Sequence, residues 1–236
     1  MRISTAMLTI LMLAVPAHAD DLADCSQRVD PQQTINGCTR VLNRATLDDR
    51  QMAMVLNNRA NAYGALAAYD LAIADYDKAI SFDPVYSHGY FNRGATNLEA
   101  GRTELAIADF DRALQIDPGL VQAFINRGLA RLEAGLLDRA IDDFSAALAL
   151  EPLSSIAHNN RGVAYRRNGK LAEAITDFEK AVALDAAYNL AAKNLSDTRS
   201  QLAQREPAEA APQSVVLTEA ARESIRRNLL LEPDVK

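Results

Sequence analysis

A short motif of asparagine, arginine and a small residue recurs every 34 residues through the middle of this chain, and this period constrains the fold more than any other feature. The motif is Asn-Arg-Ala at residues 58–60 and Asn-Arg-Gly at residues 92–94, 126–128 and 160–162. A fixed period of this length indicates stacked copies of one supersecondary unit. A single copy cannot bury its apolar face alone, so we expect one continuous array.

Three further positions repeat in phase with the motif. An alanine stands twelve residues after the small residue, an aromatic residue stands four later, and a second alanine three later still. In the second unit these are Ala106, Phe110 and Ala113, and Pro118 follows five residues on. Proline at this place starts the turn into the next unit, where its missing donor does no harm, although the fourth unit has Ala186 there.

Each unit is predicted to contain two helices. In the third unit, residues 121–134 and 137–150 both carry apolar residues at helical spacing, and Gly135 separates them. The small residues of the two helices let their backbones approach closely, and the aromatic residue fills the space beside that contact. The chain is therefore expected to be all-α.

The spacing resembles the tetratricopeptide repeat family, whose 34-residue pattern is W-x2-L-G-x2-Y, then A-x3-F, then P. The resemblance covers four units over residues 53–186, although arginine replaces the usual leucine in all four. It implies a right-handed α-solenoid of helix-turn-helix repeats, without catalytic activity, that binds a protein or peptide. The same phase continues past both ends and predicts an N-terminal cap over residues 20–52 and a C-terminal capping helix over residues 187–204.

The first nineteen residues have the pattern of a secretory signal peptide. Arg2 precedes an apolar stretch over residues 8–15, Pro16 follows, and Ala17-His18-Ala19 suits cleavage after Ala19. The alternative, an uncleaved membrane anchor, is disfavoured because the apolar stretch is shorter than the ~20 residues that span a bilayer. We therefore expect a periplasmic or secreted protein with no integral membrane segment.

Export makes a disulfide the expected state of Cys25 and Cys38. Both fall where the paired helices of the N-terminal cap should come closest, which is the separation that a disulfide requires. Two free cysteines are the alternative.

At the other end, residues 205–214 are predicted to form a linker. Residues 215–236 are predicted to form an amphipathic tail helix, because Ala221, Ile225 and Leu229 lie at helical spacing.

Charge and motifs exclude several classes of function. The net charge of −6 argues against a nucleic-acid partner, because nonspecific affinity for phosphate needs clustered basic residues. The sequence has no phosphate-binding loop, no Gly-x-Ser-x-Gly motif and no cluster with metal-ligand spacing. We expect no cofactor, no metal and no enzymatic activity, and an enzyme with an unrecognised site is the alternative.

The repeated arginines are expected to form structural ion pairs. An aspartate recurs sixteen residues after each arginine, on the facing helix, and buried charge is usually matched. The alternative is an arginine ladder that grips acidic partners. The residues concerned are Arg59, Arg93, Arg127 and Arg161 with Asp75, Asp109, Asp143 and Asp177.

The repeated asparagines lie on the first helix of each unit, which the family resemblance places on the concave surface. An amide both donates and accepts, so a ladder of asparagines can hold a peptide main chain. The alternative is that these amides bond to neighbouring helices. The candidate ladder is Asn58, Asn92, Asn126, Asn160 and Asn194.

On the same surface, apolar residues are expected in the middle, at Phe91, Ile125 and Leu129. Polar residues are expected at the ends, at Asn57, Asn61, Asn159, Arg166 and Arg167.

Together these features predict a scaffold or adaptor of the bacterial envelope that binds an extended or helical segment in its concave groove. A second hypothesis is that the tail helix over residues 215–236 occupies the groove of its own chain or of a neighbour, giving autoinhibition or self-association.

Overall fold

The structure is a computed structural model that describes residues 18–27, 30–44 and 46–205, and within those residues every regular element is an α-helix. The helices are α1 His18–Ser26, α2 Pro31–Arg44, α3 Asp49–Ala65, α4 Tyr69–Phe82, α5 Ser87–Glu99, α6 Thr103–Ile116, α7 Val121–Glu133, α8 Leu137–Leu150, α9 Ser155–Arg167, α10 Leu171–Leu184 and α11 Asn189–Arg205. The predicted all-α solenoid of helix-turn-helix repeats is confirmed.

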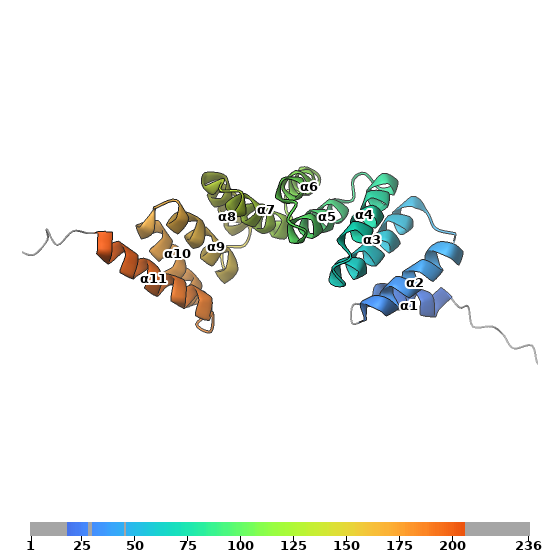
Figure 1. The fold of residues 1–236 in the computed structure, drawn as a ribbon, viewed down its shortest axis with the longest axis horizontal. Helices are drawn as coiled ribbons and strands as arrows, with labels where there is room; N and C mark the ends of the chain where they lie inside the picture. The colour runs from blue at the N-terminus through green and yellow to red at the C-terminus, as the bar shows by residue number, and fades with distance from the viewer. Residues whose placement is uncertain (1–17, 28–29, 45, 206–236) are drawn as a thin grey trace, which may run out of the picture.

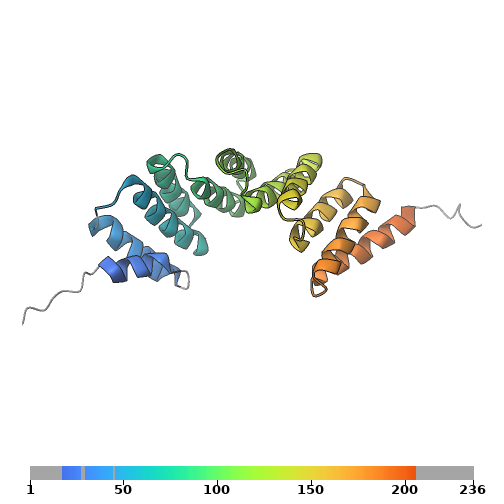
Figure 2. The ribbon, with the colours of Figure 1, turned by 180° about the vertical axis from the view of Figure 1, so that it is seen from behind.

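The helices stack as antiparallel pairs into an arch whose two ends bend to the same side (Figures 1 and 2). Each odd-numbered helix contacts the next odd-numbered helix, from α1 to α11. Among the described residues, the even-numbered helices make no such contact with one another. The odd-numbered helices are therefore closer together and line the concave side of the arch.

Every repeat is held together by an aromatic ring that meets a small residue of the facing helix. The rings of Phe110, Phe144 and Phe178 are fully buried. A Cβ atom added at Gly128 would lie 2.7 Å from Phe144 Cε1, which is closer than real side chains come. The predicted close approach of the two backbones therefore depends on glycine at this position.

The turn between the two helices of a repeat contains one residue in the left-handed region. Gly101, Gly135 and Gly169 have φ values of 73°, 76° and 78°. Glycine adopts this conformation without steric penalty. The first repeat has Ala67 at the same place, with φ of 55°.

The N-terminal cap is the helix pair of α1 and α2. A disulfide joins Cys25 and Cys38, and both are buried. Arg40 of α2 forms ion pairs with Asp21 and Asp24 of α1. The two helices of the cap are thus joined by a disulfide at the predicted cysteines, and also by ion pairs that were not predicted from the sequence.

Element boundaries differ from the predicted ones by a few residues. Helix α3 begins four residues before residue 53, the predicted start of the first repeat, because Asp48 and Gln51 form a capping box at the start of that helix. Helix α11 occupies the place of the capping helix predicted over residues 187–204, and its last residue, Arg205, falls in the predicted linker.

Two predictions lie largely or wholly outside the described residues. The signal peptide over residues 1–19 is described only from residue 18, and the tail helix over residues 215–236 is not described. No helix in the described part of the chain is both long enough and apolar enough to cross a bilayer.

Candidate functional site

The four arginines of the repeated motif each connect the first helix of their repeat to its second helix. Each one donates to both carboxylate oxygens of the aspartate sixteen residues on. These aspartates are no more than 6% exposed. The pairs are Arg59–Asp75, Arg93–Asp109, Arg127–Asp143 and Arg161–Asp177. The arginines are therefore occupied within the array, which leaves them little capacity for an acidic partner.

The same arginines also reach back to the preceding unit. The Nη1 atom of Arg127 lies 2.6 Å from Asp111 of α6, and Nη1 of Arg161 lies 3.1 Å from Ser145 of α8. Burial lowers the pKa of Arg127, but hydrogen bonds and charge from Asp143 and Asp111 outweigh it and hold that pKa above its ordinary value. These contacts fix the angle between repeats and hence the shape of the concave surface.

Two of the predicted ladder asparagines donate to an asparagine of the preceding odd-numbered helix. Asn92 of α5 donates its side-chain amide to the Asn57 oxygen at 2.9 Å, and Asn194 of α11 donates to Asn159 at 2.9 Å. Asn57, Asn159 and Asn194 are buried. Each of these contacts links one odd-numbered helix to the next.

The other three asparagines are less occupied. Asn92 and Asn194 each bond to the residue 35 positions earlier, and for Asn126 and Asn160 that residue is apolar: Phe91 and Ile125. Within the described residues, Asn58 and Asn126 make no side-chain hydrogen bond, and Asn160 only accepts one from Asn159 at 3.3 Å. All three are half-buried, so their amides remain open to a ligand on the concave side.

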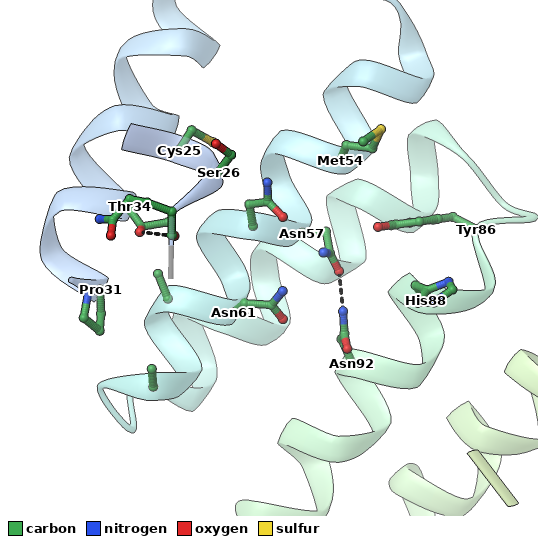
Figure 3. Close-up of a pocket in the computed structure, with 14 residues that line it drawn as sticks. Cys25, Ser26, Pro31, Thr34, Met54, Asn57, Asn61, Tyr86, His88 and Asn92 are labelled. Carbon is green, nitrogen blue, oxygen red and sulfur yellow. Dashed lines mark hydrogen bonds between the residues drawn. The ribbon is translucent and has the colours of Figure 1, made fainter. Parts of the chain in front are cut away.

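A hollow lies at the N-terminal end of the concave side (Figure 3). It has a volume of about 730 Å³ and lies between the cap and helices α3 and α5. Four asparagines contribute to its wall, together with side chains of the cap and of the first turn of α5. The principal lining residues are Asn57, Asn58, Asn61, Asn92, Thr34 and His88. The site is therefore rich in amides, and among its four asparagines Asn58 alone has no side-chain hydrogen bond within the described residues.

Sequence reasoning missed several residues of this cleft. Met54 and His88 lie one turn before Asn58 and Asn92 on the same helix faces, so helical spacing could have indicated them. Ser26 and Thr34 come from the cap, and no repeated position points to them. Asn61 accepts a hydrogen bond from the hydroxyl of Tyr76, which positions its amide from the second helix of the repeat.

The predicted apolar residues are half-buried and pack between helices. The ring of Phe91 lies 6.0 Å from that of Phe110, centroid to centroid. Ile125 and Leu129 both pack against the cluster that contains Phe144. The structure thus places the three at the base of the concave surface, with only part of each side chain accessible.

His158 belongs to the core of the fourth repeat. Its Nδ1 atom lies 2.9 Å from Asp177 and its Nε2 atom lies 3.3 Å from the carbonyl oxygen of Pro152. It therefore supports the same aspartate that Arg161 binds. In the part of the chain that the structure describes, no three His, Cys, Asp or Glu residues are grouped so that they could hold a metal ion.

Comparisons with known proteins agree with the repeat architecture. Three models of the tetratricopeptide repeat family match residues 53–86, 87–120 and 125–189. No curated protein matches the chain.

Several solved structures have a similar fold. MamA from Desulfovibrio magneticus RS-1 is 20% identical over 72% of this chain and 94% of that chain, with a TM-score of 0.65. A second MamA structure is 21% identical over 81% of this chain and 94% of that chain, with a TM-score of 0.62. YrrB, described as a tetratricopeptide repeat protein with an unusual peptide-binding site, is 21% identical over 69% of this chain and 82% of that chain, with a TM-score of 0.59. At these identities the likeness shows the fold alone.

Proposed function

Because the chain belongs to the tetratricopeptide repeat family, we propose that it binds an extended peptide segment of another protein along its concave surface. The family and its fold support a protein-interaction scaffold in general. The observation that carries the finer proposal is the pair of amides, Asn58 and Asn126, that lack a side-chain partner among the described residues on a surface where Asn92 and Asn194 have one. YrrB offers a parallel, since it is described as having a peptide-binding site.

The proposed ligand enters at the amide-lined cleft and continues toward α7 and α9. Asn58 contributes to the cleft wall, Asn126 follows two repeats later, and Asn160 follows one repeat after that. Each amide would donate to a peptide carbonyl and accept from a peptide N–H, which holds a main chain without reading its side chains. The exposed parts of Phe91 and Ile125 add apolar contact between these rungs.

We place the protein in the periplasm or outside the cell. The signal-peptide pattern of residues 1–19 supports export, and the cap disulfide suits an oxidising compartment. Amino-terminal sequencing of the protein recovered from the envelope tests this, with Asp20 as the expected first residue. A first residue of Met1, or recovery only from the cytoplasm, would contradict export.

The binding proposal is tested first by photo-crosslinking in the native compartment. A photoreactive phenylalanine analogue replaces His88 in the cleft or, as the matched control, Leu105, which is exposed on α6. Adducts are expected from position 88, and the captured partner is identified by mass spectrometry. Adducts from position 105 alone would overturn the concave assignment.

A synthetic peptide from the crosslinked region then tests the role of the free amides. The double substitution Asn58→Ala/Asn126→Ala is expected to weaken binding about 30-fold, from four hydrogen bonds, two for each amide, at about 0.5 kcal/mol each. Asn194→Ala is the control, because its amide is already used within the array; it should lower stability and leave affinity unchanged. Equal loss of affinity in both variants would refute main-chain holding by Asn58 and Asn126.

A further inference from the structure

Helix α11 has one packed face and one face without a partner. Its start repeats the phase of the array, since Asn194-Leu195-Ser196 falls 34 residues after Asn160-Arg161-Gly162. Ala191, Asn194 and Thr198 are buried toward the preceding repeat. In the complete repeats the opposite face of the first helix is covered by the second helix; Gly162, for example, is buried against Phe178.

In α11 the equivalent face is open. Ala192 and Ser196 are both exposed, and α11 is the last helix of the arch in the part that the structure describes (Figure 1). At the corresponding positions of α9, His158 and Gly162 are buried beneath α10. Helix α11 therefore corresponds in sequence phase to the first helix of a repeat, and none of the described residues supplies a second helix for it.

The sequence of residues 218–233 supplies a candidate for that second helix. Aligned with residues 103–118, which contain α6 and the proline after it, the segment is identical at six of sixteen positions. The identical pairs are Thr103 and Thr218, Glu104 and Glu219, Ala106 and Ala221, Arg112 and Arg227, Leu114 and Leu229, and Pro118 and Pro233. Ile225 stands where the buried ring of Phe110 does, and Glu232 replaces Asp117 before the proline.

One departure from the repeat pattern occurs both in α11 and in residues 218–233. All four complete repeats pair an arginine of the first helix with a buried aspartate of the second. In the fifth unit the arginine position holds Leu195 and the aspartate position holds Ser224. A buried aspartate facing Leu195 would be an unpaired charge, which is strongly destabilising, whereas serine avoids that penalty. The concerted loss of both charges is what packing of these two segments on each other requires.

The connecting segment is long enough. Twelve residues, 206–217, separate the end of α11 from Thr218. Fully extended they span up to about 40 Å, whereas the 17 residues of α11 are about 26 Å long. Every point on the open face is within reach of the same chain.

We propose that residues 218–233 pack on the open face of α11 in the same chain, as the second helix of a fifth repeat. This arrangement closes the C-terminal end of the array and leaves the concave surface free. It replaces the hypothesis that the tail occupies the groove, and it does not depend on the proposed peptide-binding function.

The native disulfide provides the geometry for a test. In the repeat pattern, Cys25 corresponds to Leu195 and Cys38 corresponds to Ala221. The Cα atoms of Cys25 and Cys38 lie 4.5 Å apart. The full-length variant Leu195→Cys/Ala221→Cys is expected to form an intramolecular disulfide in the oxidised monomer, mapped by mass spectrometry of unreduced peptides. The matched control is Leu195→Cys/Glu223→Cys, because the residues equivalent to Glu223 in the four repeats are all exposed. A bond between two chains would show that a second copy covers the face. No bond, or equal bonding in both variants, would overturn the proposal.

Hydrogen exchange on full-length protein without added cysteines gives an independent readout. Ile225→Asp is expected to speed exchange in α11 at least tenfold, to the rate of a chain ending at Arg205, while Glu223→Asp leaves it unchanged. Faster exchange in α3 and α5 instead would show that the tail binds the groove. Unchanged exchange in α11 would show that the tail does not pack on this helix.

Discussion

Removal of Arg59 is expected to be the most damaging of the four arginine substitutions. Asp75 is 4% exposed, and Arg59 is its only side-chain partner within the described residues, through Nε at 2.6 Å and Nη2 at 2.9 Å. In Arg59→Met the apolar part of the side chain is retained, but the aspartate becomes an unpaired buried charge. Breaking a buried pair in this way costs about 3–5 kcal/mol. We therefore expect the free energy of unfolding to fall by that amount in chemical denaturation.

The other repeats provide a graded internal comparison. In Arg127→Met, Asp143 keeps Arg131, whose Nη1 atom lies 2.8 Å away, so the expected loss is about 2 kcal/mol. In Arg161→Met, Asp177 keeps only a hydrogen bond with His158, so we expect an intermediate loss. The loss of stability should therefore be largest in Arg59→Met, intermediate in Arg161→Met and smallest in Arg127→Met, according to the partners that each aspartate keeps.

A double substitution separates charge burial from packing. Arg59→Met/Asp75→Leu removes the orphaned carboxylate and should recover most of the stability lost in Arg59→Met, because an apolar pair of similar volume is often as stable as the buried ions. The slope of unfolding free energy against denaturant must stay constant for the comparison to hold. A loss below 1 kcal/mol for Arg59→Met, or a loss in Arg127→Met at least as large, would refute the reasoning from residual partners.

Three further predictions concern stability. Ala67→Gly should raise the free energy of unfolding by about 0.5 kcal/mol, because it relieves a left-handed alanine where the other repeats have glycine; a lower melting temperature would contradict this. Gly128→Ala should cost about 1–3 kcal/mol, because its Cβ would overlap the buried ring of Phe144; unchanged denaturation would contradict it. Reduction of the Cys25–Cys38 disulfide should remove about 3 kcal/mol of stability from the cap. Hydrogen exchange should then quicken in α1 and α2 and stay unchanged in α8–α10, since contacts in repeat arrays are between neighbours; uniform quickening would count against this.

The sequence was sufficient for the fold because its signals are local and repeated. The contact between Gly128 and Phe144 recurs in phase, so one unit explains the others. The start of helix α3 was harder to place than the repeat itself, because it depends on the capping box of Asp48 and Gln51, which lies outside the repeated pattern. Only part of the cleft could be predicted from the sequence, because Thr34 comes from a cap whose sequence does not follow the repeat pattern.

Whether each repeated asparagine forms a hydrogen bond within the array could not be predicted from its own position, because this depends on a residue of the neighbouring helix. The position before the asparagine in the preceding repeat holds Asn57 or Asn159 near the ends of the array, and there the next asparagine is bonded. It holds Phe91 or Ile125 in the middle, and there the next asparagine has no such acceptor. Where the neighbouring residue is an asparagine, the repeated asparagine donates a hydrogen bond to it; where the neighbour is apolar, this hydrogen bond is missing. For this reason the amides without an internal partner are found by comparing residues 35 apart rather than 34, because a spacing of 35 pairs each asparagine with the residue that faces it on the preceding odd-numbered helix.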